Sequence, residues 1–415
     1  MKLRFLSLLF SLFAATICFG TPGQSSPDAV TSPAPVPVIS LVTAEPGPEV
    51  FELYGHQGVR VNTPGGMDLT YNFGVFDFNS PNFVYRFVKG ETDYMGAIFP
   101  TSLFLSEYEE RGSKVTEQVL NLKPDEALRM AGALNEAIRP ENAVYRYKYC
   151  TDNCATRVLD ILESSLSSPV SYFDASPELD TYRKVMRRYD SAYPWYVLGV
   201  DVALGGTMDT VIGTRERMFV PMELMRSAAD ARLADGRKLV KQTNILVPGR
   251  GDVTEKPTPF LLTPVFWAWV ILLFSLVALS RAMRHGWSRW RWWLCIWWTL
   301  CGAAGALSTF LIFISVHEGT SPNIIGWWLN PLWLIPAYTI FVPRWRRFTL
   351  CVLVMLSIMT GAMLLVWNIS PHAVNGALML ACVTTLALSC GYIFTGSSTH
   401  ERRPHHHHGG KKKKA

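Results

Sequence analysis

The chain has 415 residues, of which 49% are hydrophobic, and it contains 14 tryptophans. This composition excludes an ordinary soluble enzyme and indicates a membrane protein. The formal net charge is +6, but the basic residues cluster between and after apolar runs. That is a pattern of membrane topology, and it excludes nucleic acid as the explanation of the charge.

The first 40 residues predict an exported protein. Residues 1–20 have a basic start, a short apolar run and small residues near Gly20, which is the layout of a secretory signal peptide. Thr16 and Ile17 do not form a lipobox before Cys18, so we expect ordinary cleavage or an uncleaved anchor. Residues 21–40 are a Pro- and Ser-rich tether that cannot bury a core.

Residues 41–255 mix aromatic and charged side chains over a length sufficient for one sizeable domain. Alternating segments at 51–61 and 67–78, on both sides of a TPGG turn, predict a β-hairpin. Apolar residues at helical spacing predict a helix over 124–138, and renewed alternation predicts a strand over 141–149.

A second helix is predicted to start at Cys154. Its apolar face follows two good capping residues, Asp152 and Asn153, in the sequence CTDNCATRVLDILESSL. This places the Cys154 thiol in the first turn of the helix.

Residues 260–396 contain five apolar runs near the length that crosses about 30 Å of hydrocarbon. The five predicted spans are Phe260–Leu279, Trp292–Val316, Ile324–Val342, Phe348–Trp367 and Val374–Phe394. Basic clusters follow the first, third and fifth spans, the last of them in the basic tail at 397–415. The positive-inside rule places these clusters in the cytoplasm and the domain at 41–255 on the outer side of the membrane.

His56 is the only histidine in the first 284 residues. A thiol at a helix N-terminus is favoured as thiolate by the helix dipole, and a histidine beside it can take its proton. Free N–H groups at the helix start, where Asn153 lies, can stabilise the oxyanion that forms when the thiolate attacks a carbonyl. His56 and Cys154 together therefore indicate nucleophilic acyl transfer.

The sequence spacing of His56 and Cys154 alone also allows interpretations without catalysis. A cysteine and a histidine far apart in sequence are usually unrelated, and Cys150 with Cys154 is a candidate disulfide in an oxidising compartment. No metal or organic cofactor is predicted, because one histidine and carboxylates without ligand spacing do not form a zinc site.

A family resemblance favours catalysis. The motifs GHQGVRV, YNFGVFDFNSPNFVYRFVKG, ENAVYRYKY and DNCATRVLDILE, with HEGTSPNIIGWWLNPLWLIP in the membrane half, resemble the Lnb-type lipoprotein N-acyltransferase family. The resemblance implies an α+β exported domain with a circularly permuted papain-like fold, similar to lecithin:retinol acyltransferase relatives, followed by a five-helix membrane domain. It implies a bacterial inner-membrane protein whose exported domain lies on the periplasmic face, and it carries a nucleophile over to Cys154 and a base to His56. Cys150 departs from the pattern, which has a large aromatic residue there.

A third group should orient the imidazole of His56. The hairpin places Asp68, Tyr71 or Asn72 across from it; Asp68 and Asn72 have suitable chemistry, and Tyr71 is expected in the core. The choice depends on the turn, because a slip of one residue exchanges the faces.

Five further residues are candidates for substrate binding, each with a structural alternative. Asp77 lines a cleft or stabilises a turn, and Arg157 binds an anion or is a solvated helix arginine. His317, Glu318 and Asn330, in and near an exported loop, either cradle a lipid headgroup or serve the loop itself.

The resemblance implies that the acyl donor is a membrane phospholipid and the acceptor is the α-amino group of a diacylglyceryl-cysteine lipoprotein, with a thioester intermediate on Cys154. Two other hypotheses stay open. One is a membrane-anchored thiol peptidase or amidase, and the other is a non-catalytic receptor that binds a lipid or a protein.

Overall fold

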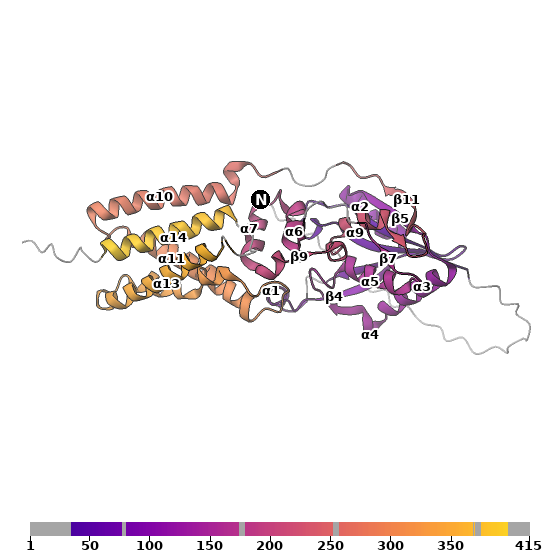
Figure 1. Ribbon diagram of the computed structural model, residues 1–415, viewed down its shortest axis with the longest axis horizontal. Helices are drawn as coiled ribbons and strands as arrows, with labels where there is room; N and C mark the ends of the chain where they lie inside the picture. Colours follow the sequence, from indigo (N-terminus) through magenta and orange to yellow (C-terminus); the bar gives the residue numbers. More distant parts are fainter. Residues whose placement is uncertain are drawn as a thin grey trace, which may run out of the picture. The chain divides into compact units, whose positions relative to one another are not determined.

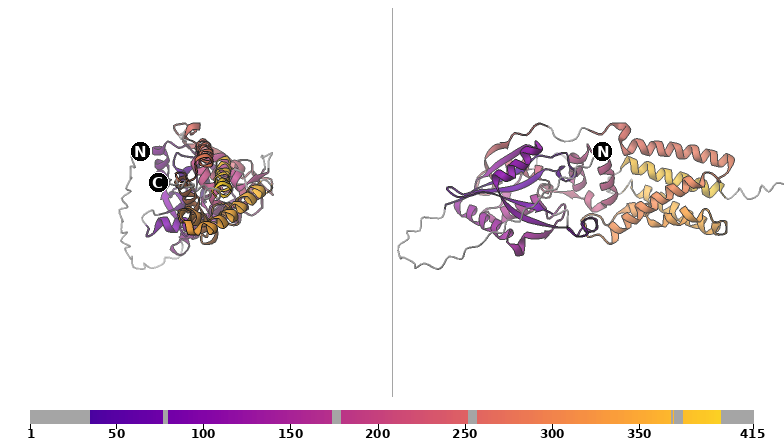
Figure 2. Two further views of the ribbon diagram at one scale, coloured as in Figure 1. Left: turned by 90° about the vertical axis from the view of Figure 1, so that its left-hand side faces the viewer. Right: turned by 180° about the vertical axis from the view of Figure 1, so that it is seen from behind.

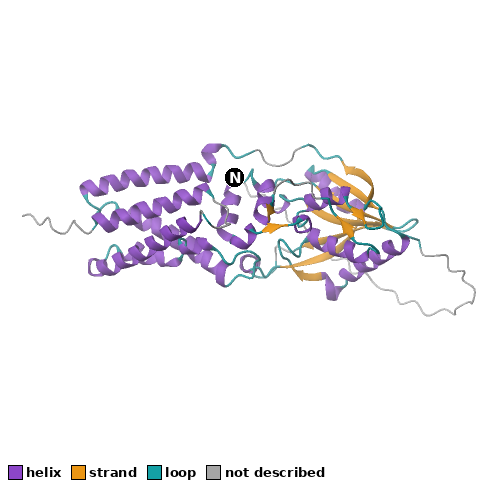
Figure 3. Cartoon of the chain, viewed as in Figure 1, coloured by secondary structure: helices purple, strands orange, loops and turns teal. Residues whose placement is uncertain are grey.

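The structure is a computed structural model that describes residues 35–76, 80–173, 179–251, 257–367, 369 and 375–396. The predicted signal peptide, the tether up to residue 34 and the basic tail lie outside the described residues. The rest forms a domain of sheet and helices followed by long apolar helices (Figure 1, Figure 3). This confirms the predicted α+β class of the exported half.

The exported half contains eleven strands and nine α-helices among the described residues. The strands are β1 (Val38–Ala44), β2 (His56–Asn62), β3 (Asp68–Val75), β4 (Asp93–Pro100), β5 (Val115–Leu120), β6 (Val144–Arg146), β7 (Val170–Ser171), β8 (Asp180–Thr181), β9 (Val211–Ile212), β10 (Arg232–Leu233) and β11 (Val240–Val247). The helices are α1 (Phe83–Lys89), α2 (Thr101–Arg111), α3 (Pro124–Ala137), α4 (Pro140–Ala143), α5 (Cys154–Ser165), α6 (Tyr182–Asp190), α7 (Pro194–Ala203), α8 (Thr214–Arg217) and α9 (Pro221–Asp230). Two short 3-10 helices are η1 (Val50–Glu52) and η2 (Gly206–Asp209).

The main sheet has seven antiparallel strands in the order β11-β5-β1-β2-β3-β4-β6. Strands β2 and β3 are the predicted hairpin, and Asn62 pairs with Asp68 next to the turn. Gly65 in this turn has φ +70°, a conformation that glycine adopts without strain. The hairpin therefore follows from its local turn chemistry.

Helices cover both faces of this sheet. Leu41 of β1 and Val59 of β2 share one apolar core with side chains of α3 and α5, including Met130 and Val158. Val42 and Ala44 of β1 face the other way and pack with Phe104 and Tyr108 of α2. Because β1 is buried on both faces, its sequence VISLVTA is a nearly continuous apolar run.

The predicted helices at 124–138 and from Cys154 are confirmed as α3 and α5. The strand predicted over 141–149 is wrong for most of its length. Pro140 starts the one-turn helix α4, because proline is well suited to the first turn of a helix, and only Val144–Arg146 pairs with β4.

The membrane half has four helices long and apolar enough to span a bilayer among the described residues, and not the predicted five. They are α10 (Pro264–His285), α11 (Arg291–Phe313), α13 (Arg346–Trp367) and α14 (Gly376–Thr395). Figures 1 and 2 show α10 and α14 side by side. The turn η3 (Phe260–Leu262) precedes α10.

The third predicted span is a broken segment. It consists of η4 (Ile324–Trp327), η5 (Pro331–Trp333) and α12 (Leu334–Thr339), followed by η6 (Pro343–Trp345). The Asn330 side chain accepts from Leu332 N at 3.1 Å and donates to carbonyls of the preceding turn, so it ends one turn and starts the next. Prolines inside the segment remove further backbone donors. Hydropathy alone does not detect these breaks.

This broken segment nevertheless runs the whole length of α11. A Cβ on Gly305 would lie 2.3 Å from Asn330 N, and a Cβ on Gly302 would lie 2.7 Å from Leu334 Cγ. Further along, the rings of Phe341 and Trp292 lie 4.7 Å apart. Irregular backbone is tolerated at membrane depth where protein buries it. The basic clusters that follow the first and third predicted spans therefore still lie at the same end of the membrane helices.

Candidate functional site

The candidate site lies where β2 begins and α5 begins. Asn153 has extended backbone, and its Oδ1 accepts from Ala155 N at 2.8 Å and Thr156 N at 3.0 Å. These bonds fix the start of α5 at Cys154, as its capping sequence predicts. His56 is the first residue of β2, opposite Ala44 of β1.

The pKa of the Cys154 thiol is lowered below its ordinary value. Burial acts to raise it, but the charge of His56, a hydrogen bond with His56 and the backbone N–H groups of Gln57 and Cys154 outweigh burial. The Gln57 N–H is available for this contact because the pairing of β2 with β3 extends only to Gly58 and Asn72. A lowered pKa increases the fraction of thiolate, which is the nucleophilic form of cysteine.

The pKa of His56 is raised in the same arrangement. Burial acts to lower it, but the Cys154 thiolate and hydrogen bonds to Cys154 and Asn72 outweigh burial. His56 Nε2 donates to Asn72 Oδ1 at 2.6 Å, and the ring stacks against Tyr108 at 6.5 Å. Both directions favour the charged forms, thiolate at Cys154 and imidazolium at His56.

Gly74 lies beside both side chains. It has φ +99°, and the register of β3 with β4 shifts between Phe73 and Val75. A Cβ on Gly74 would lie 3.9 Å from both Cys154 Cβ and His56 Cε1 and 4.0 Å from Tyr147 Cε2. A side chain at this bulge would strain the backbone, and its Cβ would be in van der Waals contact with both groups.

Of the two candidates for the orienting group, Asn72 contacts His56 and Asp68 does not. Asp68 Oδ2 forms an ion pair with Arg60 at 2.6 Å, and its Oδ1 accepts from Thr101 Oγ1 at 2.7 Å. Its pKa is lowered mainly by the Arg60 hydrogen bond. Tyr71 lies in the core, as predicted.

The Asn153 side chain acts as a cap and not as a free donor. Its Nδ2 donates to Tyr149 O at 2.8 Å and Phe219 O at 2.9 Å, so both amide hydrogens have acceptors. The Asn153 side chain therefore has no amide hydrogen left to donate to an oxyanion.

Arg157 binds a partner within the domain. Its guanidinium pairs with Asp152 at 2.6 Å and lies over the Tyr145 ring, 3.5 Å from the centroid. Asp77, the other candidate in this half, lies outside the described residues.

Glu318 contacts the loop that leads into α5. Its Oε2 accepts from Cys150 N at 3.2 Å and its Oε1 from Thr151 Oγ1. His317 Nε2 donates to Phe87 O at 2.6 Å. Asn330 lies further along, in the broken membrane segment, so the structure brings His317 and Glu318 to the exported domain but not Asn330.

Cys150 is a buried free thiol, as is Cys154, so the alternative of a disulfide between them is wrong. Burial and the Glu318 carboxylate raise the pKa of Cys150 well above its ordinary value. Only Cys154 of the two is therefore activated. No group of His, Cys, Asp and Glu within the described ranges is arranged to hold a metal.

Sequence reasoning missed two contributors to this site. The only sequence signal for Gly74 is its position inside a predicted strand. The only signal for Tyr147 is its alternation with Tyr145, in a segment where the observed strand is short. A glycine inside an alternating strand is itself a signal of a bulge or a close approach.

Two family models match this chain. Residues 29–188 match the Lnb N-terminal periplasmic domain, and residues 255–399 match the Lnb transmembrane domain. The two matches together cover most of the chain, and the first contains both His56 and Cys154. No curated protein and no solved structure shows a significant match, so the permuted papain-like relationship stays a prediction.

Proposed function

Because the chain belongs to the Lnb-type family of bacterial membrane proteins with a periplasmic domain, we propose that it is a lipoprotein N-acyltransferase. Its donor is a membrane phospholipid, and its acceptor is the α-amino group of a diacylglyceryl-cysteine lipoprotein. The observation that supports the proposal is the placement of Cys154 at the start of α5 next to His56, whose Nε2 donates to Asn72 Oδ1 at 2.6 Å, with the pKa lowered at Cys154 and raised at His56.

In the first half-reaction, the Cys154 thiolate attacks the carbonyl carbon of a phospholipid ester. The negative charge on the carbonyl oxygen is stabilised by backbone N–H groups at the start of α5. When the C–O bond breaks, the His56 imidazolium gives its proton to the leaving oxygen. A lysophospholipid departs, and the acyl group stays on Cys154 as a thioester.

In the second half-reaction, the neutral amine of the lipoprotein attacks the thioester carbon. His56, now neutral, accepts a proton from the attacking nitrogen, the C–S bond breaks, and Cys154 leaves as thiolate. The product is an amide, and the thiolate and imidazolium pair is restored. Asn72 supports both steps, because its acceptor fixes Nε2 as a protonated nitrogen and directs the other ring nitrogen to the sulfur.

A location in the inner membrane suits this reaction. Both substrates are lipids confined to a bilayer, so an enzyme anchored by α10, α11, α13 and α14 meets them at high effective concentration.

The test is mass spectrometry of lipoprotein N-termini from cells that produce the wild type or Cys154→Ala. We expect an N-terminal amide-linked acyl chain with the wild type only. Cys150→Ser is the matched control, since Cys150 is buried four residues earlier but is not activated, and it should retain activity. Amide-linked chains with Cys154→Ala would overturn the assignment.

A second measurement separates acyl transfer from peptide hydrolysis. Wild-type protein given phospholipid without acceptor should gain the mass of an acyl chain on the peptide that contains Cys154, and neutral hydroxylamine should release it. Activity without this adduct would indicate direct transfer or another nucleophile. Peptide hydrolysis without lipoprotein modification would indicate a thiol peptidase.

A further inference from the structure

Five aromatic rings form a continuous row across the exported domain. Ring centroids lie 5.9 Å apart between Phe87 and Phe83, 6.2 Å between Phe83 and Phe76, and 5.0 Å between Phe76 and Tyr94. Tyr94 and Tyr147 are stacked at 4.3 Å. These spacings are those of aromatic pairs in contact. We call Phe87, Phe83, Phe76, Tyr94 and Tyr147 the aromatic row.

One end of the aromatic row reaches the candidate catalytic pair. Tyr147 Cε2 borders the space above Gly74 that Cys154 Cβ and His56 Cε1 also border. Burial, and next the charge of a Cys154 thiolate, raise the pKa of Tyr147 well above its ordinary value, so its hydroxyl stays neutral. The row therefore ends beside the candidate catalytic pair.

The other end reaches a membrane helix. Lys89 O, at the end of α1, accepts from Val316 N at 2.8 Å, just after α11. The Tyr85 ring of α1 lies 6.3 Å from the ring of Phe310, in the last turn of α11. Helix α1 thus lies against the end of α11 that faces the exported domain.

Helix α1 is unusually apolar on its exposed side. Val84 is 73% exposed, Tyr85 55% and Phe87 49%. Its two charged residues, in contrast, have partners, since Arg86 pairs with Asp93 at 2.5 Å and Lys89 with a neighbouring glutamate. Exposed apolar side chains beside the end of a spanning helix are suited to the edge of a bilayer and not to water.

The inner members of the row are available to a ligand. Phe76, Phe83, Tyr94 and Tyr147 are neither fully buried nor fully exposed. Partly accessible rings offer an apolar surface to an alkyl chain while the sheet and α1 hold them in place.

We propose that the aromatic row binds the acyl chain of the phospholipid donor, which passes from the bilayer over α1 and lies along the row with its ester at Cys154. This rests on the proposed function, because it assigns the donor site of the same reaction. We expect an acyl chain to occupy the row because one end of the row contacts a membrane helix and the other end lies beside the proposed nucleophile. An extended apolar path also keeps the alkyl chain out of water when the ester leaves the membrane surface.

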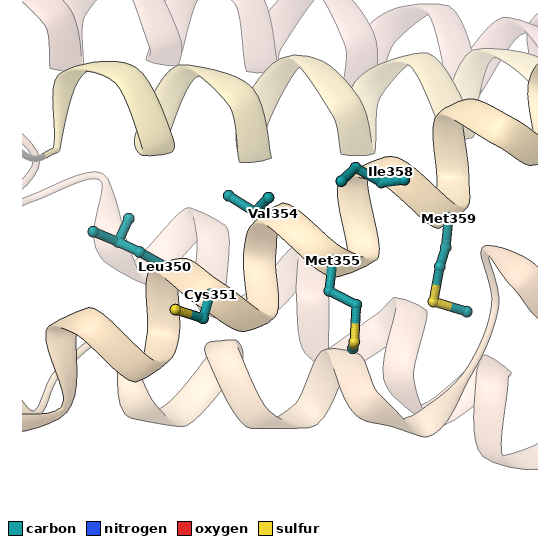
Figure 4. Close-up of a pocket in the computed structure, with 6 residues that line it drawn as sticks. All are labelled: Leu350, Cys351, Val354, Met355, Ile358 and Met359. Atoms are coloured by element: carbon teal, nitrogen blue, oxygen red, sulfur yellow. The ribbon is translucent and has the colours of Figure 1, made fainter.

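A different apolar surface serves as the comparison. A pocket on α13 is lined by Leu350, Cys351, Val354, Met355, Ile358 and Met359, all on one membrane helix, and it contains none of the candidate site residues (Figure 4). Lipid chains that merely surround the protein are expected there.

The first test measures phospholipid binding in a variant that cannot form the thioester. The full chain with Cys154→Ala is placed in vesicles that contain a phosphatidylethanolamine with a diazirine on one acyl chain, and the cross-linked peptides are mapped. We expect cross-links on the peptides of Phe83, Phe87 and Tyr94 in addition to those on α13. Cross-links confined to the membrane helices would overturn the proposal, whether or not the protein proves to be an acyltransferase.

The second test measures the rate of acyl transfer from two donors. Phe83→Ser should lower acyl transfer from long-chain phospholipid vesicles about ten-fold, because the chain loses apolar contact, with little change for a water-soluble hexanoyl ester. Phe173→Ser is the matched control, since Phe173 is 66% exposed in the exported domain and is not part of the row. Equal loss with both donors would overturn the proposal. If the wild type transfers an acyl group from neither donor, the proposed function is wrong. The cross-linking result alone then decides whether the aromatic row binds an acyl chain.

Discussion

Substitution of Asn72 with alanine tests the arrangement of the candidate site most directly. The substitution removes the acceptor that lies 2.6 Å from His56 Nε2 and leaves a partly buried donor without that partner. An unpaired donor that is fully buried costs about 1–3 kcal/mol, which is the upper bound here. If all of this cost falls on the orientation of the imidazole, the rate of the chemical step drops by about five-fold to 150-fold.

The assay is the rate of Cys154 alkylation by iodoacetamide across pH, together with acyl-transfer kcat. The Asn72 hydrogen bond helps to raise the pKa of His56, so Asn72→Ala should lower that pKa and weaken the ion pair that lowers the pKa of Cys154. The rise of alkylation with pH should therefore move to higher pH, and the range in which thiolate and imidazolium coexist should narrow.

The matched control is Asn135→Ala. Asn135 also accepts a hydrogen bond, from Tyr71 OH at 2.7 Å, but it does not contact His56. It should alter stability without moving the alkylation profile. A profile for Asn72→Ala that coincides with that of the wild type, with kcat unchanged, would refute the orienting role.

Three other predictions follow from described contacts. Burial raises the pKa of Asp190 to about 7, above its unfolded value of about 4, so its contribution to folding stability is full below about pH 4 and is lost as pH rises through about 7. Asp190→Asn should flatten this decline in a series of thermal unfolding curves, and an unchanged slope would contradict it. Glu318→Ala should reduce acyl transfer more than Glu318→Gln, because an amide oxygen still accepts from the loop before α5; equal activities would contradict the contact. Reporter fusions at Arg347 should be cytoplasmic and one at Asn323 periplasmic, and a common side for both would show that the broken segment does not cross the membrane.

The features that local sequence encodes are the ones that could be predicted. The hairpin depends on its glycine turn, and the start of α5 depends on one capping side chain, so each is fixed by residues close together in the chain. Cys154 and His56 could be paired because each is distinctive in type and position.

The features that could not be predicted depend on distant partners. The choice between Asp68 and Asn72 is made by Arg60, which forms an ion pair with the aspartate, and by a register that the turn sets. The broken third span has enough apolar residues for a helix, but Asn330 and the prolines interrupt it, and the glycines of α11 that accommodate it lie on another element. An average over a hydropathy window contains neither kind of information.

The contacts of Glu318 give a physical reason for joining the two halves in one chain. Glu318 holds the backbone of Cys150 and the hydroxyl of Thr151, and Asn153, two residues later, caps the helix that begins with Cys154. A displacement of this loop therefore moves Cys154 relative to His56 and Gln57, which lower its pKa. Because Glu318 follows α11, a residue of the membrane half contacts the loop that leads to Cys154, and under the proposed function we expect the membrane helices to help to position the nucleophile.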